Sequence, residues 1–183
     1  MKKNVLTSSV QKTPVSSCKE KLYIGVDPGL SGAIAAIGPE TLLTKNFPCL
    51  NDGTKRYLNI IELRDLLIEL VEPYGKDNCL ICLEKSQPMP RDGVMGSFRY
   101  GEAYGILKGL FVSMEFPLME VAPITWKTKM IGKGKDKDAS RMLASQLYPQ
   151  LGEFLKLKKD HGKAEALLLA EYGKRIHSGK NLF

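Results

Sequence analysis

The stretch from Leu22 to Ile37, LYIGVDPGLSGAIAAI, most constrains what this chain can fold into. Its first residues are apolar and partly β-branched, which is typical of a buried strand. Asp27 ends that strand, and Pro28-Gly29 turns the chain. A second apolar run begins at Ala33, so the pattern predicts a β-hairpin with a wide loop. The Asp27 carboxylate then sits where a core strand meets solvent, either capping its own turn or binding a positive group.

A second carboxylate follows a second apolar run. Residues 79–83, CLICL, are typical of a strand covered on both faces, and Glu84 comes directly after them. Strand alternation points Cys79 and Cys82 to opposite faces, which disfavours a shared metal or disulfide and predicts buried thiols. If the two strands are parallel neighbours, their ends lie about 4.8 Å apart. Asp27 and Glu84 are then placed to share one metal ion.

A third acid lies in residues 156–173, KLKKDHGKAEALLLAEYG. The run Ala164–Ala170 predicts a helix that is apolar almost all round and therefore buried, with Asp160 as its N-cap. Glu165 is the exception within it, because a buried carboxylate needs a partner. His161 precedes it by one helical turn and lies on the same helix face. Glu165 either pairs only with His161 or a lysine, or joins the other acids.

The remaining pattern predicts one domain with a mixed sheet. A third strand is expected near 43–47, a loop at 51–53, an amphipathic helix from about 57 to 71, and a strand at 119–122. Helices are expected from about 98 to 113, with Ser97 as cap, and from about 139 to 147, while the late helix ends near Gly173. Strands first, with helices interspersed afterwards, predict an α/β fold with helices on both faces of the sheet.

Size and composition fit a single domain at residues 21–177 of the 183-residue, 20.3 kDa chain. Residues 1–20 are rich in Lys, Ser and Thr and lack the apolar core of a secretory signal. We expect a disordered arm there, with a degenerate organelle-targeting segment as the alternative, and a polar tail at 178–183. No run approaches the ~20 apolar residues of a membrane span.

Two glycine-containing basic segments are candidate DNA contacts. Residues 89–101 interleave aromatic rings with arginine, which suits base stacking and phosphate docking, although such rings equally belong to cores. Residues 131–138, IGKGKDKD, either follow a phosphate chain or are a solvated charge run. The net charge of +7 and pI of about 9.2 favour a polyanionic partner. The candidate DNA-binding residues in and near these segments are Arg91, Ser97, Phe98, Arg99, Tyr100, Lys133, Lys135, Lys137 and, further along the chain, Lys163.

The three acids point to metal chemistry if the late helix reaches the two strand ends. Carboxylate oxygens suit magnesium or manganese. Two such ions about 3.5–4 Å apart activate a water and stabilise the leaving oxygen of a phosphodiester. Mutual repulsion among clustered acids is what such ions relieve.

Four segments together resemble the RuvC-type Holliday junction resolvases. They are residues 24–33 (IGVDPGLSGA), Leu83-Glu84, Trp126-Lys127 and 159–169 (KDHGKAEALLL), and the likeness is closer to the monokaryotic-chloroplast branch, which some bacteria and phages share. The resemblance implies a ribonuclease-H-like fold with a five-stranded sheet. It implies a homodimer that makes paired symmetrical nicks in a four-way DNA junction during recombination and repair. It further implies two Mg²⁺ or Mn²⁺ ions per site, no organic cofactor and no membrane partner.

The resemblance also assigns roles to individual residues. It implies catalysis by Asp27, Glu84, Lys127, His161 and Glu165, all of which except Lys127 are candidate metal ligands. Lys127 is the candidate phosphate contact, and the segment before Tyr100 matches the part that enters the junction centre. The fourth ligand stays open between His161 and Asp160. The implied location is the cytoplasm or nucleoid of a bacterium or phage host, or alternatively the chloroplast nucleoid.

Two other functions share part of the pattern. Sugar-kinase-like ATPases also open on an Asp-Pro-Gly turn, but the chain has no second glycine-rich phosphate loop and is short for that class. A non-catalytic DNA-architectural protein with a relict site is the third possibility. Nucleotide binding would support the ATPase, and junction binding without nicks would support the architectural protein.

Overall fold

The computed structural model describes residues 21–29, 31–53, 56–85, 93–134 and 137–179. The expectations for the arm at 1–20, for the end of the tail, and for Arg91 and Lys135 fall outside these residues. Lys137 begins a helix, but its side chain is not among the described ones.

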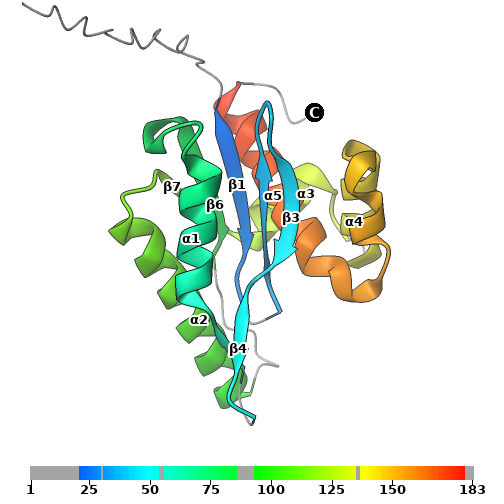
Figure 1. Cartoon of the computed structure of the whole chain (residues 1–183). Helices are drawn as coiled ribbons and strands as arrows, with labels where there is room; N and C mark the ends of the chain where they lie inside the picture. Colours follow the sequence, from blue (N-terminus) through cyan, green and yellow to red (C-terminus); the bar gives the residue numbers. More distant parts are fainter. Residues whose placement is uncertain (1–20, 30, 54–55, 86–92, 135–136, 180–183) are drawn as a thin grey trace, which may run out of the picture.

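A mixed five-stranded sheet forms the centre of the molecule (Figure 1). Its strand order is β3-β2-β1-β6-β7. β2 runs antiparallel to β1 and β3, whereas β6 runs parallel to both β1 and β7. The predicted hairpin and the parallel pairing of the two acid-bearing strands are therefore confirmed. The strands are β1 Leu22–Asp27, β2 Ala33–Ile37, β3 Leu42–Asn46, β6 Cys79–Glu84 and β7 Leu118–Val121.

Helices cover both faces of this sheet, as predicted. The helices α1 (Ile60–Val71) and α2 (Val94–Ser113) lie on one side in Figure 1, and α3 (Pro123–Met130), α4 (Lys137–Leu147) and α5 (His161–His177) on the other. Each side has its own apolar core. Cys79 belongs to the first core and Cys82 to the second, so the two thiols do point to opposite faces. The chain also forms 3₁₀ helices at Lys76–Asn78, Pro149–Leu155 and Lys158–Asp160.

The helix α5 lies directly on β1. A Cβ atom at Gly25 would be 1.9 Å from the carbonyl oxygen of Ala166, so only glycine allows this approach. The residues of α5 from Ala164 to Gly173 are all buried, which confirms the prediction of a buried late helix. The strand β1 and the start of α5 are thereby fixed against each other, which is what positions the site.

Two predicted boundaries differ from the structure, each for a local reason. Of the loop predicted at 51–53, Asn51 ends a strand, whereas Asp52 and Gly53 lie outside the strands as expected. The helix start predicted near 57 is wrong, because a small second sheet, β4 Cys49–Asn51 with β5 Arg56–Leu58, occupies this part of the chain. Helix α1 begins only after Asn59, whose Oδ1 accepts the amide of Glu62 at 3.2 Å. Within β5, Leu58 is buried and Tyr57 exposed, an alternation too short to outweigh the helical pattern beyond it.

Two helix ends differ as well. The predicted cap Ser97 lies inside α2, which starts three residues before it at Val94 with Gly93 as its N-cap. The late helix does not end near Gly173 but continues to His177. A Cβ atom at position 173 would lie 2.1 Å from Cys82 Sγ, so this glycine serves helix–sheet packing and does not terminate the helix. Among the described residues, no helix has the length and apolar character needed to cross a bilayer.

Candidate active site

Three carboxylates meet at one edge of the sheet. Asp27 is the last residue of β1 and Glu84 the last of β6, and parallel strands bring their carboxyl ends to the same edge. Glu165 comes from α5 and faces them. One oxygen of each side chain lies within 4.8 Å of the other two. We call Asp27, Glu84 and Glu165 the acid cluster; the sequence singled out these three, and the fold brings them together.

The start of α5 reaches the cluster because Gly162 has no side chain. A Cβ atom there would lie 2.9 Å from Asp27 Oδ2 and 3.0 Å from the carbonyl oxygen of Ser31. Both contacts are tighter than most real Cβ contacts, so a larger residue would require the Asp27 carboxylate, the Ser31 carbonyl or the start of the helix to move. The helix N-terminus also carries partial positive charge, which favours a carboxylate beside it.

Among the described residues, Lys127 on α3 is the lysine paired with the cluster. Its Nζ lies 2.7 Å from Glu165 Oε1 and 3.9 Å from Glu84 Oε2. Burial lowers the pKa of Lys127, but Glu84, Glu165 and Asp27 outweigh it and hold that pKa above its usual value. The ammonium is therefore charged, and one positive charge faces three acids.

The three carboxyl groups respond differently to this surrounding. Burial, with the negative charges of Glu84 and Glu165, raises the pKa of Asp27 well above its usual range. Burial also raises the pKa of Glu84, against the opposing effect of Lys127. For Glu165, burial is the largest influence, but the hydrogen bonds from His161 and Lys127 together with the charge of Lys127 bring its pKa below the usual value. The surroundings thus lower the pKa of Glu165 and raise the pKa values of Asp27 and Glu84.

His161 lies beside the cluster. Its Nε2 is 3.2 Å from Glu165 Oε1, and its Nδ1 is buried with no hydrogen-bond partner among the described residues. The set of ligand atoms that lie within 4.8 Å of one another does not include a His161 nitrogen. His161 is therefore adjacent to the acids, with an unused ring nitrogen.

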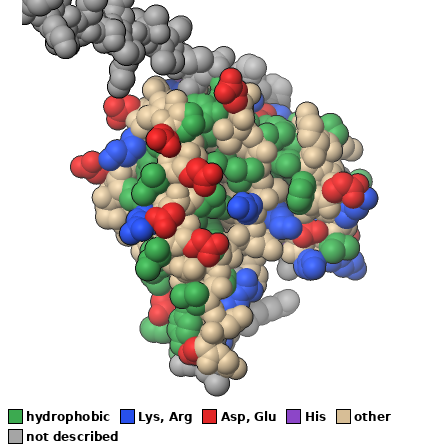
Figure 2. Space-filling model, viewed as in Figure 1, with side chains coloured by type: hydrophobic (Ala, Val, Ile, Leu, Met, Phe, Trp, Pro, Cys, Tyr) green, Lys and Arg blue, Asp and Glu red, His purple; other side chains and the backbone are tan. Residues whose placement is uncertain are grey.

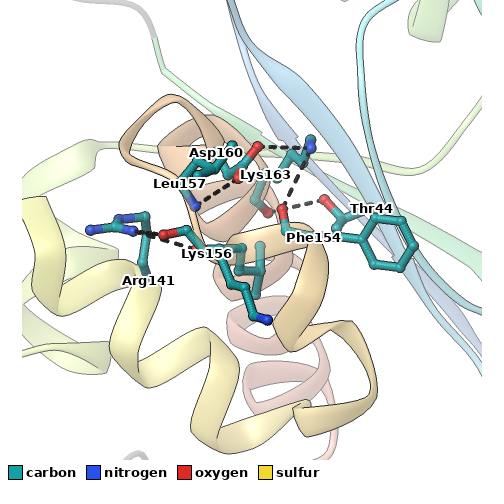
Figure 3. Close-up of polar contacts among 8 residues, drawn as sticks. Thr44, Arg141, Phe154, Lys156, Leu157, Asp160 and Lys163 are labelled. Carbon is teal, nitrogen blue, oxygen red and sulfur yellow. Dashed lines mark hydrogen bonds and ion pairs between the residues drawn. The ribbon is translucent and has the colours of Figure 1, made fainter.

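Asp160 faces a different part of the molecule (Figure 3). Its Oδ2 accepts the amide of Leu157 and its Oδ1 accepts Lys163 Nζ, each at 2.9 Å. Asp160 occupies the N-cap position of α5, but its side chain makes no capping hydrogen bond to that helix, which corrects the predicted cap. Between the two candidates for a fourth ligand, only His161 is turned to the acid cluster.

The contacts in Figure 3 hold the segment that leads into α5. Arg141 Nη1 of α4 donates to the carbonyl of Lys156 at 2.8 Å, and Lys163 Nζ donates to the carbonyl of Phe154 at 3.4 Å. Thr44 Oγ1 of β3 donates to the carbonyl of Lys163 at 3.1 Å. These bonds join α4 and β3 to the start of the helix that carries His161 and Glu165.

The predicted DNA-binding residues fall into three groups. Lys133 and Lys127 line a cavity of about 390 Å³ that is also lined by His161 and Glu165.

The second group lies at the start of α2. Phe98 and Arg99 are exposed there, and the ring of Tyr100 lies against Gly29, where a Cβ atom would be 3.3 Å from Tyr100 Cε2. Ser97 is half-buried on the same helix. Lys163 is mostly buried and pairs with Asp160, away from the other candidates.

Sequence reasoning missed two hydrogen-bond donors at the cluster. Trp126 Nε1 donates to Glu84 Oε2 at 2.6 Å, and Ser140 Oγ donates to Glu165 Oε1 at 3.4 Å. Trp126 is the only tryptophan of the chain and directly precedes Lys127, which was a usable signal. Ser140 stands in a stretch without any distinguishing pattern.

The residues present fit a divalent cation. The donor set consists of hard carboxylate oxygens, the type that Mg²⁺ and Mn²⁺ prefer. Among the described residues, its three acids outnumber the one lysine paired with them, and His161 Nε2 lies 3.2 Å from Glu165 Oε1. Such a site can bring a metal-bound water to a phosphodiester.

No protein-family model matches the chain. Among known proteins, the chloroplastic Holliday junction resolvase MOC1 of Chlamydomonas reinhardtii is 35% identical over 85 residues, which is 46% of this chain and 10% of that protein. The crossover junction endodeoxyribonuclease RuvC of Bacteroides fragilis is 24% identical over 148 residues, covering 78% of this chain and 74% of the relative. The chain thus spans about a tenth of the chloroplast protein and most of the bacterial one. The resemblance to RuvC-type resolvases is confirmed.

Two solved structures share the fold. The RuvC structure from Thermus thermophilus superposes with a TM-score of 0.53 at 14% identity, covering 85% of this chain and 96% of that one. The same protein in complex with a Holliday junction substrate gives a TM-score of 0.51 at 13% identity, covering 87% and 97%. With the mixed five-stranded sheet, these matches establish the predicted ribonuclease-H-like α/β fold.

Proposed function

We propose that this protein is a metal-dependent endonuclease that resolves four-way DNA junctions by paired symmetrical nicks. The observation that carries the proposal is the acid cluster, where three carboxylates from β1, β6 and α5 lie within 4.8 Å of one another. The named activities of the two relatives, a Holliday junction resolvase and a crossover junction endodeoxyribonuclease, support the same reading.

Asp27, Glu84 and Glu165 would hold the metal, with His161 as the candidate fourth ligand. Bound Mg²⁺ or Mn²⁺ supplies a reactive water at neutral pH and charge stabilisation for the leaving oxygen. The chain's own part is to bring these carboxyl groups to face one another at the edge of the sheet. Lys127 borders the same cavity, where an ammonium released from Glu165 can bind a phosphate oxygen of the substrate.

Charge supports a DNA substrate. The net charge is +7, and Lys127 and Lys133 line the cavity at the acid cluster. On the face shown in Figure 2, acidic side chains lie mainly over α1, and lysines and arginines lie mainly towards α4. Phosphates approaching from the α4 side meet attraction on the way to the cluster.

A homodimer is the proposed assembly. A four-way junction is two-fold symmetric, so a two-fold protein presents two equivalent sites to opposed strands. Recognition then depends on branched shape and phosphate contacts, with base contacts at the cut setting sequence preference. Phe98, Arg99 and Tyr100 at the start of α2 are the proposed contacts near the junction centre. The nucleoid of a bacterium, phage host or chloroplast is the proposed location.

A labelled synthetic four-way junction tests the proposal. With Mg²⁺, the wild-type protein should nick two opposed strands at symmetrical positions, and the Glu84→Gln variant should bind the junction without nicking it. Glu171→Gln serves as the control, because Glu171 is buried on α5 outside the acid cluster. Cleavage retained by Glu84→Gln would refute the proposed site. Junction binding without nicks by the wild-type protein would favour an architectural role.

A further inference from the structure

The buried indole of Trp126 contacts the acid cluster directly. Trp126 lies on α3, has an exposed fraction of 0%, and donates its Nε1–H to Glu84 Oε2 over 2.6 Å. Glu84 is itself only 5% exposed. The bond therefore joins two buried side chains, one of them in the proposed metal site.

The hydrogen bond from Trp126 to Glu84 Oε2 also restricts the direction in which Glu84 Oε1 points. The terminal torsion of a glutamate side chain is broad when nothing holds it. A short hydrogen bond to Oε2 from a donor fixed in the core restricts that torsion, and with it the direction in which Oε1 faces. Burial of the indole restrains the donor, since Trp126 is fully buried and belongs to the same apolar cluster as Leu168 and Val121.

Trp126 also suits an ionised partner. An indole nitrogen donates one hydrogen bond and accepts none. It therefore favours the acceptor-only, ionised form of Glu84, which is the form that binds a cation. A bond of this type to a charged group is stronger than one between neutral groups.

The same ring faces Lys127. Its Nζ lies 5.2 Å from the Trp126 ring centroid, within range of a cation–π contact. The Trp126 side chain thus contacts both the Glu84 carboxylate and the Lys127 ammonium. Lys127 has a long flexible chain with its side chain 36% exposed, whereas Trp126 is immobilised by packing.

We propose that Trp126 is a positioning residue, which holds the Glu84 carboxylate in the orientation that receives the metal ion. This inference rests on the proposed function of the acid cluster as a metal site. Residues that orient a metal ligand without touching the metal typically change metal affinity by about 10- to 100-fold when they are replaced.

The Trp126→Phe variant removes the donor and keeps an aromatic ring. In calorimetric titration of the full chain with Mn²⁺, without DNA, we expect about 10- to 100-fold weaker binding than in the wild-type protein. In junction nicking, the Mg²⁺ concentration at half-maximal rate should rise similarly, and the rate at saturating Mg²⁺ should recover most of its wild-type value. A purely structural loss would instead lower the maximal rate and leave the half-saturating Mg²⁺ concentration unchanged.

Tyr148→Phe is the matched control. Tyr148 Oη donates to Glu171 Oε2 at 2.5 Å, so this variant also removes one aromatic donor from a buried glutamate, but outside the acid cluster. It should leave both the Mn²⁺ affinity and the half-saturating Mg²⁺ concentration as in the wild-type protein. Equal weakening in Tyr148→Phe would overturn the assignment to Trp126.

A second measurement needs no change at Trp126. The chain has one tryptophan, so its indole N–H gives a single resonance in a ¹⁵N–¹H spectrum. Mg²⁺ should shift this resonance in the wild-type protein along the same binding curve as the calorimetric titration, and Glu84→Gln should abolish the shift.

The outcomes separate the two proposals. If the wild-type protein neither binds Mn²⁺ nor nicks the junction, the proposed function fails. If it does both, and Trp126→Phe keeps the wild-type affinity, the positioning role of Trp126 is wrong while the function stands. If Trp126→Phe does not fold, the indole resonance decides: no shift at Mg²⁺ concentrations that occupy the site would overturn the inference.

Discussion

Two buried glutamates on the same helix have opposite surroundings. Glu171 accepts Tyr148 Oη on Oε2 and Arg175 Nε on Oε1, the latter at 2.6 Å. One acid thus meets one cation and one neutral donor. Burial together with Glu171 raises the pKa of the Tyr148 phenol, which therefore stays a donor throughout the working pH range.

Glu165 shares its surroundings with two more acids. Lys127 Nζ lies 2.7 Å from it and His161 Nε2 lies 3.2 Å from it, but Asp27 and Glu84 stand within 4.8 Å. A buried acid paired with one cation is a complete structural unit. Three acids around one ammonium are not, because their repulsion is relieved only by more positive charge. The comparison therefore separates a structural carboxylate from one that awaits a cation.

The largest effect that tests this difference is on catalysis. Glu165→Gln should reduce junction nicking by more than about 100-fold, since even residues behind a metal ligand cost 10- to 100-fold. Glu171→Gln should stay within a few-fold of the wild-type rate. Single-turnover nicking at saturating protein measures both, with folding of each variant verified by circular dichroism. Equal losses in two folded variants would remove the distinction between the two glutamates.

The next effect is on stability with metal. A ligand at 100 times its dissociation constant stabilises the folded state by about 2.7 kcal/mol, which raises Tm by roughly 5–10 °C for a chain of this size. We expect Mg²⁺ to produce this shift in the wild-type protein and in Glu171→Gln. Glu165→Gln should lose most of it. Thermal unfolding with Mg²⁺ and with a chelator checks this, and an equal shift in Glu165→Gln would place the metal elsewhere.

The smallest effect is a pH dependence of the metal-free protein. The pKa of Asp27 is raised in the folded state by burial and by Glu84 and Glu165. The folded protein therefore binds a proton that the unfolded chain releases near pH 3.9. The contribution of Asp27 to stability is fully present below that pH and is lost as pH rises through the raised pKa, by at most about 1.4 kcal/mol per pH unit.

Asp27→Asn isolates this contribution. The variant should lose the fall in stability over that pH window, and Glu171→Gln should keep it. Urea unfolding across a pH series, with a chelator present, gives the free energies of unfolding. A slope that persists in Asp27→Asn would mean that another group holds the proton.

The sequence predicted the sheet and the acid cluster well because both depend on strong local patterns. Apolar runs ending in Asp27 and Glu84 marked two buried strands, and an acid within an apolar helical run marked Glu165. Sheet geometry then requires the ends of parallel neighbours to meet. The expected meeting of the three side chains was conditional on parallel neighbouring strands and on a late helix that reaches their ends, and the structure meets both conditions.

What the sequence did not predict depends on contacts between distant residues. The bond from Trp126 to Glu84 requires α3 to pack beside the end of β6, which no local pattern specifies. Gly173 was interpreted as a helix end, but its role is to admit Cys82 Sγ from the sheet. The Asp160 side chain likewise faces Leu157 and Lys163 because Asp160 ends the 3₁₀ helix Lys158–Asp160 before α5.

The location of a bound metal ion tests the central claim most directly. Anomalous diffraction from crystals grown with Mn²⁺ identifies the ion without reference to activity. The account predicts Mn²⁺ coordinated by carboxylate oxygens of Asp27, Glu84 and Glu165, with Lys127 displaced from Glu165. Mn²⁺ bound only elsewhere, with Lys127 still paired to Glu165, would contradict it.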